Sequence, residues 1–360
     1  MIWWWKKRFW DLRALWMCRH HVVICPDRAG WVLDAVAQQL AVSLPDECRA
    51  GISRGPDLHF LRNRVVHFLG QFDVFGAEPL RGVHPSNRLV ATWWHGSPGS
   101  RDENVRAAFN AAPLLAGRLA RIVVTCSIYE QLLRSAGIAP DRLVRLPLGV
   151  DTRRFAPADS TARRRARARF DIPSDAFCVG SFQKDGIGWG EGREPKLIKG
   201  PDVLVAALSR LADRGVFVVL AGPARGYVMG ELRRRGIRFA CAGHVPQWRL
   251  SELYHALDAY LITSREEGGP ASLLEAMACG VPVVSTRVGM AADIIRDGEN
   301  GFLAAVEDAE TLAAKVAQLQ EDSALRARVA AAAVATARGL DWAIVAREYY
   351  ERLYRPLLQC

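Results

Sequence analysis

The chain has 360 residues, of which half are apolar and 24% are charged; this is typical of a folded soluble protein with room for two domains. Extensive disorder is excluded by the same values. The net charge is +10, and the excess lies in the front half: residues 1–156 hold 21 Lys and Arg against 13 Asp and Glu, whereas residues 157–360 hold 27 against 25. An anionic partner of the front half is therefore expected, either a membrane surface, a phosphorylated acceptor or nucleic acid.

The eight cysteines are scattered along the chain. They form no Cys-x-x-Cys pair, and the histidines have no paired spacing, which argues against a zinc site and against a disulfide framework. Several cysteines lie inside apolar runs, as in Val22–Cys25, where a reduced buried thiol is expected. We therefore expect a cytoplasmic protein that binds no metal.

Residues 1–19 interleave five tryptophans with five Lys and Arg residues. The charges interrupt the apolar residues, so the segment matches neither a signal peptide nor a transmembrane helix. Two interpretations stay open. One is a helix that lies in the membrane interface with its cations on anionic lipid, which would make the protein peripheral on the inner membrane face. The other is a helix packed on the protein's own core.

In the front half, short apolar runs alternate with segments of helical periodicity. The first run is followed by a turn at Asp27–Gly30. The expected strands are His21–Cys25, Leu89–Trp93, Arg121–Ser127 and Leu143–Pro147, and the expected helices are Trp31–Ser43, Arg101–Ala116 and Ile128–Ala136. Strands that alternate with helices predict a parallel, doubly wound sheet.

The alternation restarts after a basic helix expected at Thr161–Phe170. The expected strands are Phe177–Ser181, Val216–Ala221, Arg238–Ala242, Ala259–Thr263 and Val281–Ser285, and the expected helices are Pro201–Arg214, Gly230–Arg235, Leu250–Ala256, Ser272–Ala278, Ala291–Ile295 and Ala309–Leu319. The fold class is therefore α/β, with an N-terminal domain over 1–157 and a C-terminal domain over 158–340. A last helix within 341–360 lies past the last strand and could pack back on the N-terminal domain.

Residues 264–284 carry the strongest chemical signal. An apolar strand runs into a loop with Glu267, Gly268 and Gly269, and then into a helix that carries Glu275. In doubly wound sheets, ligands bind where strands end and helices begin. The glycines allow close approach of the backbone, and free amides at a helix start suit an anion. Glu267 would lie beside that ligand and Glu275 could accept hydrogen bonds from ribose hydroxyls; the alternative is two solvated surface acids.

This segment resembles the Glu-x7-Glu signature of the group 1 glycosyltransferases (family 4), with Glu267 and Glu275 at the two acid positions. The similarity continues through 275–284, and further segments resemble family motifs at 147–155, 199–202, 241–246 and 297–302. The resemblance implies the GT-B fold, in which two Rossmann-like, doubly wound domains face a cleft. It also implies transfer of a sugar from a nucleotide diphosphate donor with retention of configuration.

The resemblance implies that two cations meet the diphosphate of the donor. Lys199 matches the lysine of the family, but Ser181 stands where the family has an arginine, and Lys184 is the nearest substitute. His244 and Val245 lie in the loop whose backbone is implied to meet the nucleobase.

The front domain is implied to hold the acceptor. Trp93–Ser97 resembles a His-Gly element of the family at a strand end, which would place His95 near the transferred sugar; a structural histidine is the alternative. Gly30 stands where the family has a glycine-rich loop near the diphosphate.

An insertion over 185–195 separates the two lysines. Its glycines fail the spacing of the dinucleotide fingerprint and no helix follows directly, so we expect a flexible loop that covers the donor.

The expected chemistry needs no cofactor other than the nucleotide sugar as co-substrate. The sequence contains no Asp-x-Asp, so the cations of side chains would stabilise the leaving diphosphate in place of a metal. The expected partners are the donor and a glycan or lipid-linked acceptor in cell-envelope polysaccharide or glycolipid synthesis, with an anionic membrane surface as a further candidate. No motif supports nucleic acid. The alternatives are a nucleotide-sugar epimerase or a phosphorylase of the same fold, and a catalytically degenerate module that binds a membrane or polyanion.

Overall fold

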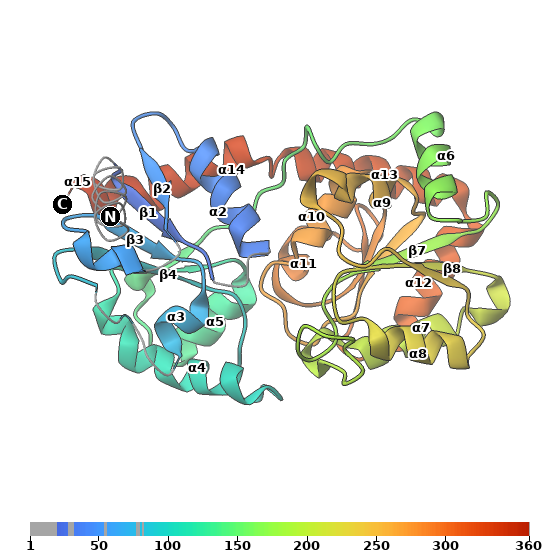
Figure 1. The fold of residues 1–360 in the computed structure, drawn as a ribbon, viewed down its shortest axis with the longest axis horizontal. Helices are drawn as coiled ribbons and strands as arrows, with labels where there is room; N and C mark the ends of the chain where they lie inside the picture. The colour runs from blue at the N-terminus through green and yellow to red at the C-terminus, as the bar shows by residue number, and fades with distance from the viewer. Residues whose placement is uncertain (1–19, 28–31, 54–55, 77–79, 81–82, 360) are drawn as a thin grey trace, which may run out of the picture. The chain divides into compact units, whose positions relative to one another are not determined.

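A computed structural model of the chain describes residues 20–27, 32–53, 56–76, 80 and 83–359, which form two compact units (Figure 1). Unit 1 comprises the described residues up to Gly149 and those from Trp342 onward, and unit 2 comprises Val150–Asp341. The expected membrane-interfacial segment 1–19 and Gly30 lie outside the described residues.

Unit 1 is built on a six-stranded parallel sheet with the order β2-β1-β3-β4-β5-β6. Its strands are β1 (Val22–Cys25), β2 (Ala50–Ile52), β3 (Val65–Phe68), β4 (Arg88–Trp93), β5 (Arg121–Val124) and β6 (Leu143–Arg145). β1 and β3 are buried at every position, and neither strand alternates between buried and exposed residues; β1 is entirely apolar, and β3 contains one polar residue, His67.

Helices cover both faces of this sheet. Figure 1 shows α3 (Gln71–Phe75), α4 (Glu103–Leu115) and α5 (Ser127–Ser135) on one side, and α2 (Val32–Ser43) with α14 (Trp342–Tyr349) on the other. The sequence pattern predicts no element at β2, β3 or α3, because runs of three to five residues are too short to show a period.

Unit 2 is a second six-stranded parallel sheet, with the order β12-β11-β10-β7-β8-β9. Its strands are β7 (Cys178–Phe182), β8 (Phe217–Ala221), β9 (Phe239–Cys241), β10 (Ala259–Ile262), β11 (Val283–Thr286) and β12 (Phe302–Ala304). The strand order reverses between β7 and β10, which are neighbours in the sheet. The prediction of two parallel α/β sheets is confirmed.

The sheet of unit 2 is also covered on both faces (Figure 1). The helices α7 (Pro201–Ser209), α8 (Gly226–Arg234) and α12 (Ala309–Glu321) lie on one side, and α9 (Leu250–His255), α10 (Ala271–Ala278) and α13 (Ser323–Arg338) lie on the other. The core between them is aliphatic, with fully buried residues such as Leu204, Val218 and Leu312. Among the described residues, the structure has no helix that is both long and apolar enough to cross a bilayer.

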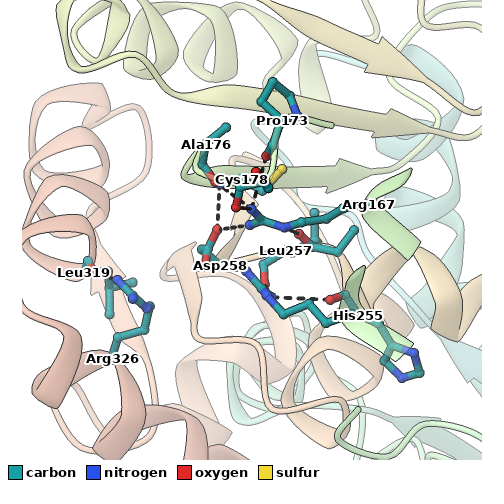
Figure 2. Close-up of polar contacts among 12 residues, drawn as sticks. Arg167, Pro173, Ala176, Cys178, His255, Leu257, Asp258, Leu319 and Arg326 are labelled. Carbon is teal, nitrogen blue, oxygen red and sulfur yellow. Dashed lines mark hydrogen bonds and ion pairs between the residues drawn. The ribbon is translucent and has the colours of Figure 1, made fainter. Parts of the chain in front are cut away.

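The basic helix α6 (Ser160–Arg169) is anchored to unit 2 by two of its arginines (Figure 2). Arg167 is 7% exposed, lies 2.6 Å from Asp258 Oδ2, and also donates to the backbone carbonyls of Pro173, Ser174, Ala176 and Ala256. Arg163 lies 2.7 Å from the other oxygen of Asp258, and the Cys178 amide donates to the same carboxylate. Buried charges of this kind need such complete pairing, because an unpaired one is costly to desolvate.

The C-terminal helices of unit 1 are held against its sheet by a buried histidine. His67 on β3 is fully buried, with Nδ1 2.7 Å from Tyr354 Oη and Nε2 2.8 Å from Thr92 Oγ1. Tyr354 lies in the π-helical turn η7 (Tyr350–Tyr354) that follows α14, and Arg88 donates to the Leu357 carbonyl beyond it. Burial lowers the pKa of His67 from 6.5 to about 3, so the ring is neutral in the folded protein.

This histidine makes the stability of the chain depend on pH. At His67, the unfolded chain takes up a proton near pH 6.5, whereas the folded chain does so only near pH 3. The free energy of unfolding is therefore highest above pH 6.5 and falls as the pH is lowered between these two values. We expect the free energy of unfolding of wild type to fall, relative to His67→Gln, by about 1.4 kcal/mol per pH unit below about 6.5. Urea unfolding of both proteins between about pH 7.5 and 5.5 measures this. Parallel pH profiles of the two proteins would contradict it.

Candidate functional site

The candidate site lies at the carboxyl ends of β7 and β10. Lys184 follows β7, and Glu267 follows β10, the neighbouring strand at which the strand order reverses. Such a switch point is where ligands bind in open α/β sheets, because the loops from the two strands diverge to opposite faces there.

The loop after β10 is held against the 3-10 turn η4 (Leu197–Lys199). The Ile198 carbonyl accepts hydrogen bonds from the backbone amides of Arg265 and Glu266, at 2.8 and 3.1 Å. The Arg265 guanidinium makes a two-pronged contact with Asp202, at 2.8 and 2.6 Å, and donates to Glu307 at 2.6 Å. Two segments that are far apart in the sequence thus form one unit.

Two glycines allow this close packing of backbones. Gly200, between η4 and α7, has φ +61°, and a Cβ there would lie 1.9 Å from the Thr263 carbonyl oxygen. Gly289 has φ +47°, and its Cβ would lie 2.2 Å from the Glu267 carbonyl oxygen. The next amide, that of Met290, donates to the Gly268 carbonyl at 2.8 Å. Both positions therefore require glycine for geometric reasons.

This packing brings two of the predicted site residues together. Lys199 Nζ donates to Glu267 Oε2 in an ion pair, and the two side chains are 18% and 15% exposed. Ser264 Oγ lies 3.5 Å from the same carboxylate oxygen. A cation and a carboxylate are thus placed side by side where a ligand can reach both.

The second lysine lies next to this pair. The Gln183 side chain donates to the Lys199 backbone carbonyl at 3.1 Å, which ties the end of β7 to η4. Lys184 Nζ donates to the Gly186 carbonyl at 3.1 Å and lies 5.1 Å from the centre of the Trp189 ring. Burial lowers the pKa of Lys184, and the charge of Lys199 acts in the same direction.

Glu275 is a buried carboxyl group on α10. It is 8% exposed, and Tyr254 Oη donates to its Oε2 at 2.8 Å. Burial raises its pKa from 4.5 to about 7, with the Tyr254 hydrogen bond acting in the opposite direction. Glu275 is therefore not a solvated surface acid. Tyr254 could not be predicted as its partner, because the two residues meet only when α9 packs on α10.

The loop that carries His244 and Val245 lies at the same edge of the sheet. It follows β9, and the Gly222 amide at the end of β8 donates to the Gly243 carbonyl at 2.8 Å. His244 is exposed and Val245 is half-buried. This loop and Lys184 are separated by one strand, β8.

In unit 1, His95 follows β4 and its backbone is held by Gln71 on α3. The Gln71 side chain donates to the His95 carbonyl at 2.9 Å and accepts from the amides of Trp94 and His95, at 2.9 and 3.2 Å. Gly96 follows with φ +133°, and the ring of Phe72 lies edge-on to the His95 imidazole. Gln71 was not predicted, since it belongs to the short helix α3 for which the sequence has no periodic signal.

The residues of unit 2 can bind an anion and a polyol. Two ammonium groups suit a diphosphate, and the carboxylate of Glu267 suits the hydroxyl groups of a sugar. Among the described residues there is no group of three or more His, Cys, Asp and Glu side chains placed to hold a metal ion.

Comparison with known proteins identifies the family. The model for glycosyl transferases group 1 matches residues 194–335. The chain is 30% identical over 323 residues to D-inositol 3-phosphate glycosyltransferase 1 of Catenulispora acidiphila, covering 82% of this chain and 72% of that protein. It is 33% identical over 256 residues to D-inositol 3-phosphate glycosyltransferase of Xylanimonas cellulosilytica, covering 68% of this chain and 59% of that protein. The chain belongs to the group 1 glycosyltransferases.

Two solved structures show the same fold. Anabaena HepE in complex with UDP-glucose has a TM-score of 0.72 at 20% identity, with 93% of this chain and 100% of that chain covered. Sucrose-phosphate synthase from Thermosynechococcus elongatus has a TM-score of 0.74 at 18% identity, with 94% and 100% covered. The fold is therefore that of the GT-B glycosyltransferases, as predicted. The chain spans 51–59% of the length of the first three curated relatives.

The burial of the Glu275 carboxyl group should make the free energy of unfolding depend on pH. The folded chain binds the proton of Glu275 below about pH 7 and the unfolded chain only below 4.5, so burial costs stability as the pH rises between these values. Glu275→Gln should therefore raise the free energy of unfolding at about pH 8 by about 3 kcal/mol, and the gain should vanish near about pH 4.5.

Thermal unfolding at several pH values measures this gain. The exposed Glu299, paired with Arg296, provides a matched control, and Glu299→Gln should show no comparable pH-dependent gain. A Glu275→Gln protein that is less stable than wild type at about pH 8 would contradict the assignment.

Proposed function

We propose that this protein transfers a sugar from a nucleotide diphosphate donor to a glycan or lipid-linked acceptor, with retention of configuration and without a metal ion. The observation that carries the proposal is the Lys199–Glu267 pair beside Lys184, at the switch point of the sheet in unit 2. A degenerate module that only binds a membrane would have no need of a buried carboxyl group such as Glu275 on the helix that follows the Glu267 loop.

The proposed reaction breaks the bond between the anomeric carbon and the diphosphate. The bonding electrons leave with the diphosphate, whose growing negative charge Lys184 and Lys199 would stabilise. The positive charge left on the sugar would be stabilised by Glu267, which exchanges its lysine partner for the sugar when the diphosphate binds Lys199. The acceptor hydroxyl oxygen forms the new bond to the anomeric carbon, and its proton passes to the released diphosphate.

Other residues are proposed to bind the remaining parts of the substrates. Glu275 would accept hydrogen bonds from the ribose hydroxyls, and His244 and Val245 would meet the nucleobase. Gly268 and Gly269 would contact the diphosphate through their backbone, and Gly30 would do so from the front domain. His95 would act on the acceptor side.

The relatives suggest which substrates to test first. Curated relatives are named as D-inositol 3-phosphate glycosyltransferases, and a structural neighbour was solved with UDP-glucose. UDP-linked sugars are therefore the first donors to test, and a phosphorylated polyol is the first small acceptor. A role in cell-envelope polysaccharide or glycolipid synthesis, on the inner face of the membrane, remains our proposal for the context. The basic front half of the sequence supports it.

The proposal is tested with UDP-, GDP- and ADP-linked sugars in EDTA. One donor should raise the melting temperature of wild type and be slowly hydrolysed. Glu267→Ala should lower that hydrolysis by at least about 100-fold, because it removes a contact that acts on the transition state. Glu299→Ala, which removes an exposed glutamate outside the site, is the matched control and should keep wild-type rates. Failure of every donor to bind wild type would refute the transferase and favour the membrane- or polyanion-binding alternative.

The ribose contact is tested by the pH dependence of donor binding. If the Glu275 carboxylate accepts hydrogen bonds from the ribose, binding requires the ionised form and should strengthen as the pH rises through about 7. Calorimetry in buffers of different ionisation enthalpy should detect the released proton. Glu275→Gln should bind the donor more weakly and without proton release, although its fold is more stable at high pH. Unchanged binding by this variant would remove Glu275 from the site.

A further inference from the structure

The insertion over residues 185–195 forms an anchored hairpin, whereas the sequence predicted a flexible loop. Gly186 and Pro195 form an antiparallel bridge, and the Ile187 amide donates to the Glu194 carbonyl at 2.9 Å. Two of its glycines allow close contact: a Cβ at Gly186 or at Gly192 would lie 2.3 or 2.2 Å from the Ala224 carbonyl oxygen.

A buried ion pair fixes the base of the hairpin. Asp185 is 0% exposed and Arg225 is 2% exposed, and Arg225 Nη2 lies 3.0 Å from Asp185 Oδ2. Arg225 Nη1 also donates to three backbone carbonyls, those of Ser181, Gln183 and Ala221. On the other arm, the amides of Gly226 and Tyr227 donate to the carbonyls of Glu191 and Gly192. The hairpin is therefore tied to the ends of β7 and β8 and to the start of α8.

The tip of the hairpin carries a tryptophan that faces Lys184. Trp189 is 61% exposed, yet its ring centre lies 5.1 Å from Lys184 Nζ, and the Gly186 carbonyl accepts a hydrogen bond from the same ammonium group. The hairpin thus provides two electron-rich partners for one cation. A lysine has a flexible stem and would otherwise sample many positions, and the charges near this one act in opposite directions, since Asp185 attracts it and Lys199 repels it.

We propose that Trp189 is a positioning residue for donor binding: its indole face and the Gly186 carbonyl hold the Lys184 ammonium beside Lys199, so that both lysines meet the donor's diphosphate together. This inference rests on the proposed function of the two lysines. In this arrangement Trp189 acts through Lys184 and not by contact with the donor. The Asp185–Arg225 pair supports it by fixing the hairpin that carries the ring.

The proposal is tested by binding measurements on a double-mutant cycle. The probes are UDP, GDP, ADP and inorganic pyrophosphate, titrated by calorimetry into wild type, Trp189→Ala, Trp189→Phe, Lys184→Met and the double variant Lys184→Met/Trp189→Ala. Ile187→Ala is the matched control, since Ile187 is a similarly exposed apolar residue of the same hairpin (51%, against 61% for Trp189). The melting temperature of each variant checks that the fold is intact.

We expect Trp189→Ala to weaken binding of the diphosphate ligand by about two- to fivefold, the size of one exposed cation–π contact. Trp189→Phe should recover most of this loss and Ile187→Ala should bind as wild type does. In the Lys184→Met background, Trp189→Ala should cause no further loss, because the cation that the ring positions is already gone.

Two results would overturn this inference alone. One is wild-type affinity in Trp189→Ala. The other is an equal loss with and without Lys184, which would mean that the ring contacts the ligand directly. If wild type binds none of the four probes, the proposed function fails and this inference fails with it.

Discussion

The site in unit 2 depends on one constraint, the attachment of the loop after β10 to the turn η4. The Ile198 carbonyl accepts hydrogen bonds from two successive amides of that loop. The two hydrogen bonds from Arg265 to Asp202 also connect the loop to α7, which follows η4 directly. Because of this attachment Lys199 and Glu267, which are 68 residues apart, form an ion pair. Glycine at 200 and at 289 permits the backbone to come this close.

Burial then sets the chemical properties of Glu275 and Lys184. Glu275 is enclosed by α9 and α10 and holds its proton up to about pH 7, whereas Lys184, partly buried beside another lysine, holds its proton less strongly than usual. Both shifts work against the charge that ligand binding would require. In the proposed function, the diphosphate of the donor would add a counter-charge for both Lys184 and Lys199.

The two units use buried polar groups for a different purpose outside the site. In unit 1 the neutral imidazole of His67 connects Thr92 on β4 to Tyr354 in the C-terminal helices. In unit 2 the carboxylate of Asp258 forms ion pairs with two arginines of α6, Arg163 and Arg167. In each case a segment that lies at the end or the beginning of a unit is fixed by a few fully satisfied hydrogen bonds, and these are sensitive to the loss of any one partner.

The sequence by itself determined the fold class and predicted the main residues of the candidate site. Its alternation of apolar runs and helical periods predicted two parallel sheets, and the motif residues Lys199, Glu267 and Glu275 stood out because their loops and helix have a recognisable local pattern. Elements that are too short to show a period, such as β3 and α3, were not predictable.

Only the tertiary structure decided which partners these residues meet. Tyr254 for Glu275, Gln71 for the backbone of His95, and Arg225 for Asp185 are all contributed by segments at least 20 residues away. The insertion over 185–195 shows the same limit: a flexible loop was predicted, but in the fold Gly186 and Gly192 pack closely against Ala224. A local sequence pattern indicates which secondary structure the backbone prefers. The hydrogen-bond partners and the burial of a side chain depend instead on which distant segments the sheet brings together.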